Sequence, residues 1–153
     1  MQLIIFLFIV APFTILVHEW GHAIMASLLK VKKTEVHLGV GKIIVHRKWW
    51  TIHFFIHLFF FMGGYAKHEM DETNDHYLKQ GIIAIAGPIM NVIVCYGMLL
   101  FNGWVDVYFF RVVYLFSFWL AIVNLIPFKW NEKASDGYVF FQSLILMMKK
   151  EER

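Results

Sequence analysis

The sequence predicts an α-helical polytopic membrane protein with three transmembrane helices, a small membrane-associated antiparallel β-sheet and a short C-terminal helix. Hydrophobic residues make up 59% of the 153 residues and charged residues only 16%, whereas soluble domains average about 45–50% and about 25%. A soluble globule of this length cannot bury so much apolar surface. Together with three long apolar stretches, this composition predicts a lipid-facing chain, which we treat as a single domain over residues 1–153.

The three apolar stretches define the predicted spans. They cover residues 3–29, 81–101 and 107–128, and each is long enough to cross roughly 30 Å of hydrocarbon, which takes about 20 helical residues. Eight basic residues lie in segment 30–79, five follow Phe128, and the connection 102–106 has none. The positive-inside rule therefore predicts a multi-pass protein of the cell membrane with its N-terminus outside and its C-terminus in the cytoplasm.

The segment between the first two spans is predicted to form the β-element, over about 34–66. Gly39-Val40-Gly41 indicates a turn, and the last strand is expected to end at Gly63-Gly64. Open sheet edges cannot face lipid, so this sheet must lie against protein or a wet cavity. An exposed edge there could accept another chain as an added strand. The flanking runs rich in β-branched and aromatic residues predict the strands Thr34–Leu38, Lys42–His46 and Trp49–Phe61.

The C-terminal segment is predicted to be a short helix over about 137–148. It is apolar but too short to span, and Lys149 and Lys150 would end it at the lipid headgroups. The chain has one cysteine, Cys95, so it has no internal disulfide. It has no dense Lys/Arg run, which argues against nucleic acid as a partner.

A group with metal-binding spacing lies inside the first apolar stretch. His18-Glu19-Trp20-Gly21-His22 is an H-E-x-x-H sequence, and the i, i+4 spacing puts both imidazoles on one face of a helix. Two neutral nitrogens so placed can share one zinc ion at about 2.0–2.1 Å. Glu19 can then act as general base and acid on the water at the metal. A charged residue at membrane depth costs at least a few kcal/mol and marks a functional site.

Zinc of this kind requires a third protein ligand. Asp136 follows the third span, precedes Gly137 and heads the last apolar segment, and Glu132 is a nearby rival. An aspartate at a helix start is also an ordinary N-cap, and one carboxylate cannot freely serve as both cap and ligand. From the residues alone, the third ligand is open between Asp136 and Glu132.

With these motifs, the chain resembles the site-2 protease family of intramembrane zinc metalloproteases, in its core-only bacterial type. The matching segments follow the family's order along nearly the whole chain. One departure is that eleven residues separate Asn124 from Asp136, more than the family usually has. The segments are His18–His22 for H-E-x-x-H, Gly63–Lys67 for G-G-Y-x-K, Gly87–Asn91 for G-P-x-x-N, and Asn124–Pro127 with Asp136-Gly137 for N-x-x-P…D-G.

The resemblance implies a role for each matching residue. It implies His18, His22 and Asp136 as ligands of a zinc cofactor and Glu19 as general base and acid. It also implies that Asn91 and Asn124 position or polarise the scissile carbonyl, or line the water path. An amide at membrane depth can donate to a developing oxyanion, although it can equally well join helices.

The predicted function is an intramembrane zinc metalloendopeptidase. It would hydrolyse peptide bonds in transmembrane segments or small membrane-bound peptides through a zinc-activated water. The alternative is a non-catalytic membrane binding or immunity protein that retains a structural zinc site, which the long spacing before Asp136 favours. The expected partners are a membrane-embedded protein or peptide substrate and the lipid bilayer, while an oligomer or a regulatory membrane partner stays open.

The remaining histidines receive ordinary interpretations. His37, His46, His68 and His76 are expected to be solvated in polar loops. His53 and His57 repeat the i, i+4 spacing, but in a predicted strand and without a glutamate, so we expect no second metal site there.

Overall fold

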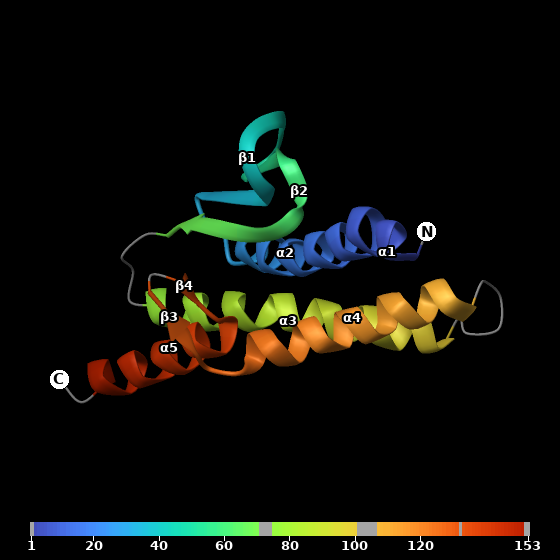
Figure 1. Ribbon diagram of the computed structural model, residues 1–153. Coiled ribbons are helices and arrows are strands. Elements are labelled where there is room, and N and C mark those ends of the chain that lie inside the picture. The colour runs from blue at the N-terminus through green and yellow to red at the C-terminus, as the bar shows by residue number, and fades with distance from the viewer. Residues whose placement is uncertain (1, 71–74, 101–106, 132, 152–153) are drawn as a thin grey trace.

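The computed structural model describes residues 2–70, 75–100, 107–131 and 133–151. Its helices form a layer in which α2 (Ala11–Leu28) packs on α3 (His76–Leu100), and α3 packs on both α4 (Val107–Leu125) and α5 (Asp136–Glu151). A two-stranded sheet covers the side of α2 that faces away from these other helices (Figure 1). The segment His18–His22 of α2 therefore lies between the sheet and α3.

The first apolar stretch forms one continuous helical rod with a local irregularity. It begins with α1 (Gln2–Ile5), passes through a π-helical turn (Phe6–Val10) and continues as α2. The backbone N–H of Ala11 donates to the carbonyl of Phe6, which closes the wider turn. Pro12 directly follows this turn and has no backbone N–H to donate, so one helical hydrogen bond is missing at this point of the rod.

Two helical segments are long and apolar enough to cross a membrane, Gln2–Leu28 and His76–Leu100. They match the predicted spans 3–29 and 81–101, although the second begins five residues earlier than predicted. The third span was predicted over 107–128, but α4 ends at Leu125. Its described apolar part, Phe109–Leu125, is shorter than the other two. The helix stops there because Pro127 cannot donate a backbone hydrogen bond and disfavours helical geometry at the preceding residue.

Large apolar side chains stay exposed along the helices. This exposed set includes Val92, Ile93, Phe118 and Trp119. So many exposed large apolar side chains are typical of a surface that contacts something other than water. Several buried residues of α2 and α3 are small, among them Ala23, Ala26, Ala84 and Ala86, and residues of this size allow helices to approach closely.

The β-element consists of two long strands that bend, β1 (Lys33–Trp49) and β2 (Ile52–Glu69). Residues 52–56 pair both with 34–38 and with 45–49, so the two halves of β1 lie on either side of them. The predicted turn at Gly39–Gly41 is therefore a bend inside β1. Gly39 and Gly41 have φ of 85° and 95°, a region that glycine enters without steric cost.

The end of the β-element also differs from the prediction. β2 does not stop at Gly63-Gly64 but bends at Gly63, where φ is 102°, and runs on to Glu69. This continuation pairs with 33–38. The sheet thus covers 33–69 instead of 34–66, because a glycine inside a strand allows a sharp bend as readily as an end.

The chain after α4 makes a small excursion before the last helix. β3 (Lys129–Trp130) and β4 (Lys133–Ala134) form a short antiparallel ladder in which Lys129 pairs with Ala134. The helix predicted over 137–148 is present as α5 and extends at both ends, from Asp136 to Glu151.

Candidate metal centre

His18 and His22 lie one turn apart on the face of α2 that meets α3. Their side chains are buried, with exposed fractions of 5% and 6%. Two glycines allow the helices to approach here. A Cβ on Gly21 would lie 2.5 Å from the carbonyl oxygen of Ala86, and a Cβ on Gly87 would overlap Nε2 of His22. Gly87 thus leaves the space that the two imidazole rings occupy.

Asp136 reaches the same place because Ser135 caps α5. The Ser135 hydroxyl accepts hydrogen bonds from the backbone N–H groups of Tyr138 (3.2 Å) and Phe128 (3.0 Å), and donates to the carbonyl of Ile126 (2.7 Å). These bonds fix the start of α5 against the chain that leaves α4. Since Ser135 is the N-cap, the carboxylate of Asp136 does not have to cap the helix, which resolves the two competing roles that the sequence suggested.

The eleven residues between Asn124 and Asp136 do not displace the aspartate. β3 and β4 form a loop that closes on itself, and the backbone N–H of Ser135 donates to the carbonyl of Phe128 at 3.0 Å. The chain therefore returns to the end of α4 before α5 begins. A Cβ on Gly137 would overlap the backbone of Leu125, so a glycine after Asp136 allows this close return.

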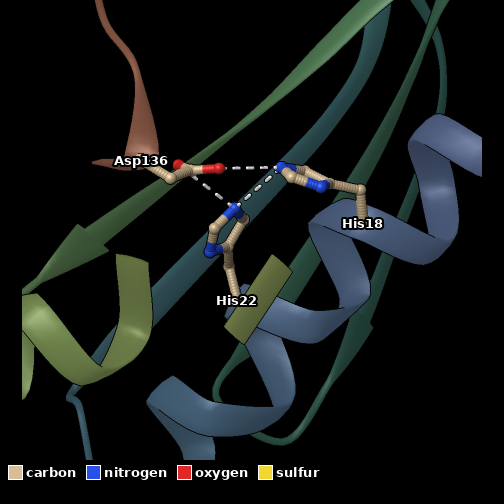
Figure 2. A group of neighbouring side chains, drawn as sticks. All are labelled: His18, His22 and Asp136. Atoms are coloured by element: carbon tan, nitrogen blue, oxygen red, sulfur yellow. Dashed lines mark hydrogen bonds and ion pairs between the residues drawn. The ribbon is translucent and has the colours of Figure 1, made fainter. Parts of the chain in front are cut away.

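The three side chains point their potential ligand atoms toward one another (Figure 2). Nε2 of His18 lies 3.0 Å from Oδ2 of Asp136 and 3.2 Å from Nε2 of His22, and Nε2 of His22 lies 3.5 Å from Oδ1 of Asp136. A tetrahedral zinc ion with ligands at about 2.0–2.1 Å separates them by roughly 3.3 Å. The donor set and its spacing therefore fit three corners of a zinc site.

The hydrogen bond behind His22 supports this fit. Nδ1 of His22 lies 2.8 Å from the carbonyl oxygen of Ile83, which can only accept a hydrogen bond. Nδ1 therefore carries the ring proton, and Nε2 presents its lone pair toward Asp136. Metal-binding histidines in proteins are held in this way by a partner on the other ring nitrogen.

A cavity of about 400 Å³ opens onto these three residues. Its lining also includes Glu19 of α2, Asn124 of α4 and residues 64–66 of β2. β2 passes close to Glu19, since a Cβ on Gly64 would lie 3.2 Å from Cγ of that residue. Four helices (α2, α3, α4 and α5) and the sheet thus contribute residues to the cavity around the candidate ligands.

The two predicted asparagines lie in different surroundings. Asn124 lines the cavity, and its amide donates to the carbonyl of Leu120 at 2.9 Å. Asn91 lies behind His18, with Nδ2 3.1 Å from Nδ1 of that histidine. The roles implied for both residues toward a scissile carbonyl stay predictions. Glu132, the rival third ligand, lies outside the described residues.

Sequence reasoning missed two other histidines, which it expected to be solvated. His68 lies on β2 and lines the cavity, and burial lowers its pKa to about 4. His37 is buried on β1, stacked between the rings of Phe55 and Tyr65, with Nδ1 3.0 Å from Nε2 of His57. The expectation was wrong because β2 continues beyond Gly64, so that His68 lies on a strand beside the cavity and the ring of Tyr65 covers His37. No local sequence pattern marks this continuation, since residues 64–68 do not alternate between apolar and polar side chains.

The fold and this centre define a class, namely proteins with helices long and apolar enough to cross a membrane and with a histidine–histidine–carboxylate group that can bind a metal. The profile of peptidase family M50 matches residues 3–105, about two thirds of the chain. The chain belongs to this family, which is the site-2 protease family of membrane-bound zinc metalloproteases, and is thus a metallopeptidase. The match includes His18–His22 and Gly87–Asn91, whereas Asn124 and Asp136 follow it.

Proposed function

We propose that this protein is an intramembrane zinc endopeptidase that hydrolyses peptide bonds in transmembrane segments or small membrane-bound peptides. The observation that carries the proposal is the spacing of the ligand atoms of His18, His22 and Asp136, which lie within 4.8 Å of one another. Two of these residues belong to a helical segment apolar enough to cross a membrane. Ionisable side chains are costly at membrane depth, so a metal centre in such a helix supports a function within the membrane.

His18, His22 and Asp136 would hold the metal. When bound, zinc supplies Lewis-acid chemistry that polarises a carbonyl group and makes a water molecule more acidic. Glu19 is adjacent to His18 in sequence, lines the cavity and is buried. Its carboxylate takes a proton from the attacking water and passes it to the nitrogen of the leaving amine. Asn124 lines the same cavity and offers an amide to the substrate carbonyl.

The substrate would bind as an extended strand along β2. A helical substrate hides its backbone groups in i to i−4 hydrogen bonds, so it must unwind before cleavage. Residues 64–68 pair with 34–38 on one side, and no strand covers their other side in the described part of the chain. Gly64, Tyr65 and Ala66 line the cavity. A strand added along this edge would therefore run past Glu19.

The topology proposed for the membrane is three spans with the N-terminus outside. The basic residues of segment 30–79 and those after Phe128 would then lie in the cytoplasm. The sheet and Asp136 belong to these two segments. The active site would accordingly lie nearer the cytoplasmic face.

The long spacing before Asp136 does not favour the non-catalytic alternative once its structure is considered. The additional residues form the β3–β4 loop, and the aspartate still faces both histidines. A structural zinc site is closed by a fourth protein ligand, whereas a catalytic one keeps a position open. The cavity beside these three residues supports the catalytic interpretation.

The test is cleavage by the Glu19→Gln variant. Wild-type protein and variant are reconstituted in lipid vesicles with a panel of reporters, each with one transmembrane segment between two tags. We expect Glu19→Gln to retain the metal and to reduce cleavage by about 10²-fold or more, because the carboxylate that moves the proton is lost.

The matched control is Glu35→Gln, the same chemical change in β1, where Glu35 pairs with Lys33 at 2.8 Å. We expect it to cleave at the wild-type rate. An active Glu19→Gln variant would contradict the role of Glu19. A wild-type protein that binds zinc but cleaves no reporter of the panel would favour the non-catalytic alternative.

A further inference from the structure

Asn91 makes a contact that the proposed chemistry does not use. It lies on α3, and its side chain is fully buried, with an exposed fraction of 0%. Its amide lies 3.1 Å from Nδ1 of His18. The other end of the amide, Oδ1, is buried without a hydrogen-bond partner among the described residues. The residue thus touches a candidate ligand from behind, outside the set of residues that line the cavity.

His22 shows which ring nitrogen of a histidine must carry the proton if the other nitrogen is to bind a metal. Nδ1 of His22 donates to the Ile83 carbonyl, so its Nε2 is free of a proton and can bind a cation. Nε2 of His18 lies 3.2 Å from Nε2 of His22, so both ring nitrogens face the same point. For both to bind one metal ion, His18 must also carry its proton on Nδ1.

The amide nitrogen of Asn91 cannot accept a hydrogen bond from Nδ1–H of His18. If the NH₂ group of Asn91 faces the ring, Nδ1 of His18 must be the acceptor, and the proton then lies on Nε2, where it blocks metal binding. The oxygen and nitrogen ends of an amide have nearly the same shape and exchange by a rotation of the group. With Oδ1 toward the ring, the unpartnered oxygen accepts from Nδ1–H, and Nε2 of His18 is free.

We propose that Asn91 is a positioning residue that accepts a hydrogen bond from Nδ1–H of His18 through Oδ1 and so holds this ring ready to bind the metal. The inference rests on the proposed function, because it concerns the same metal centre. Partners of this kind fix both the tautomer and the orientation of the ring, and their loss typically weakens metal binding by about 10–100-fold. Asn91 would then act on catalysis through His18 and not through the substrate.

Two substitutions test this role by zinc affinity, measured by chelator competition on the full chain in detergent. Asn91→Leu removes the acceptor and keeps the same number and branching of side-chain heavy atoms, and we expect zinc affinity to fall by about 10–100-fold. Asn91→Asp keeps an oxygen acceptor and removes the NH₂ group, and we expect it to bind zinc at least as tightly as the wild type. With cobalt in place of zinc, the absorption spectrum of Asn91→Leu should differ from that of the wild type, whereas the spectrum of Asn91→Asp should match it.

Ser117→Ala is the matched control. Ser117 is also fully buried, on α4, with no hydrogen-bond partner for its hydroxyl among the described residues, and we expect its zinc affinity to equal that of the wild type. Asn91→Asp decides the question even where Asn91→Leu does not fold. A loss of zinc affinity in Asn91→Asp, or wild-type affinity in a folded Asn91→Leu, would overturn the inference. Absence of zinc binding by the wild-type chain would instead overturn the proposed function itself.

Discussion

Nε2 of His18 lies 3.0 Å from Oδ2 of Asp136, although 118 positions separate these residues in the sequence. Two local features of the chain produce this contact. Gly87 leaves room for the imidazoles between α2 and α3, and Ser135 fixes the start of α5 beside the end of α4. Each feature can be removed by a single substitution that replaces no candidate ligand, so each gives a test of the site.

Gly87→Ala should weaken metal binding and leave the helix intact. Its Cβ would overlap Nε2 of His22 and lie 2.9 Å from Cε1 of His18, so both rings must move. We expect zinc affinity to fall by roughly tenfold or more, since ligand orientation sets the affinity of such sites. Gly97→Ala, on the same helix with open space around it, should leave zinc affinity unchanged and stabilise α3 by up to about 1 kcal/mol. Equal zinc affinity in the two variants would contradict this explanation of Gly87.

Ser135→Ala should loosen the start of α5. The substitution removes the acceptor for the N–H groups of Tyr138 and Phe128, and we expect the free energy of unfolding to fall by about 1–3 kcal/mol. Zinc affinity should fall as well, because Asp136 is the next residue. Ser143→Ala, which removes a buried hydroxyl of α5 without a hydrogen-bond partner in the described part of the chain, should affect neither quantity. Denaturant unfolding measures the free energy of unfolding, and chelator competition measures zinc affinity.

The stability of the sheet should depend on pH through His37. Burial of this residue on β1 lowers its pKa below the ordinary 6.5. The unfolded chain therefore takes up a proton near pH 6.5 that the folded chain does not. Stability from this residue is complete above that pH and is lost as the pH falls through 6.5 toward the lowered folded pKa.

The measurement is thermal unfolding of metal-free wild-type and His37→Gln protein between pH 8 and pH 5.5. Titration of the other groups cancels in the comparison, so the wild type should lose more stability than the variant over this range. Identical pH profiles would show that His37 does not titrate as its burial implies.

Much of the helical layer follows from properties visible along the sequence. Apolar runs predict the spans 3–29 and 81–101, close to the observed helical segments Gln2–Leu28 and His76–Leu100, because a run of this length matches the thickness of a membrane. The i, i+4 spacing brings His18 and His22 to one face because helix geometry is local. These features depend only on residues close together in the chain.

The course of the sheet and the surroundings of the metal centre depend instead on contacts between segments that are distant in the sequence. A glycine pair such as Gly39 and Gly41 permits a turn or a bend, and only the pairing of both halves of β1 with residues 52–56 selects the bend. Ser135 and Asp136 are both ordinary N-caps by residue type, and the position of Ile126 and Phe128 decides between them. The contact between Asn91 and His18 likewise depends on how α3 packs on α2, which no local pattern encodes.

The most direct test of the metal centre is metal analysis of the detergent-purified protein beside its Asp136→Ala and Glu132→Ala variants. We predict about one zinc ion per chain in the wild type, as expected for a site with three protein ligands, and the same content in Glu132→Ala. Asp136→Ala should lose most of the metal, because only the two histidines would remain. Full zinc content in Asp136→Ala, or its loss in Glu132→Ala alone, would contradict the assignment of Asp136 as the third ligand.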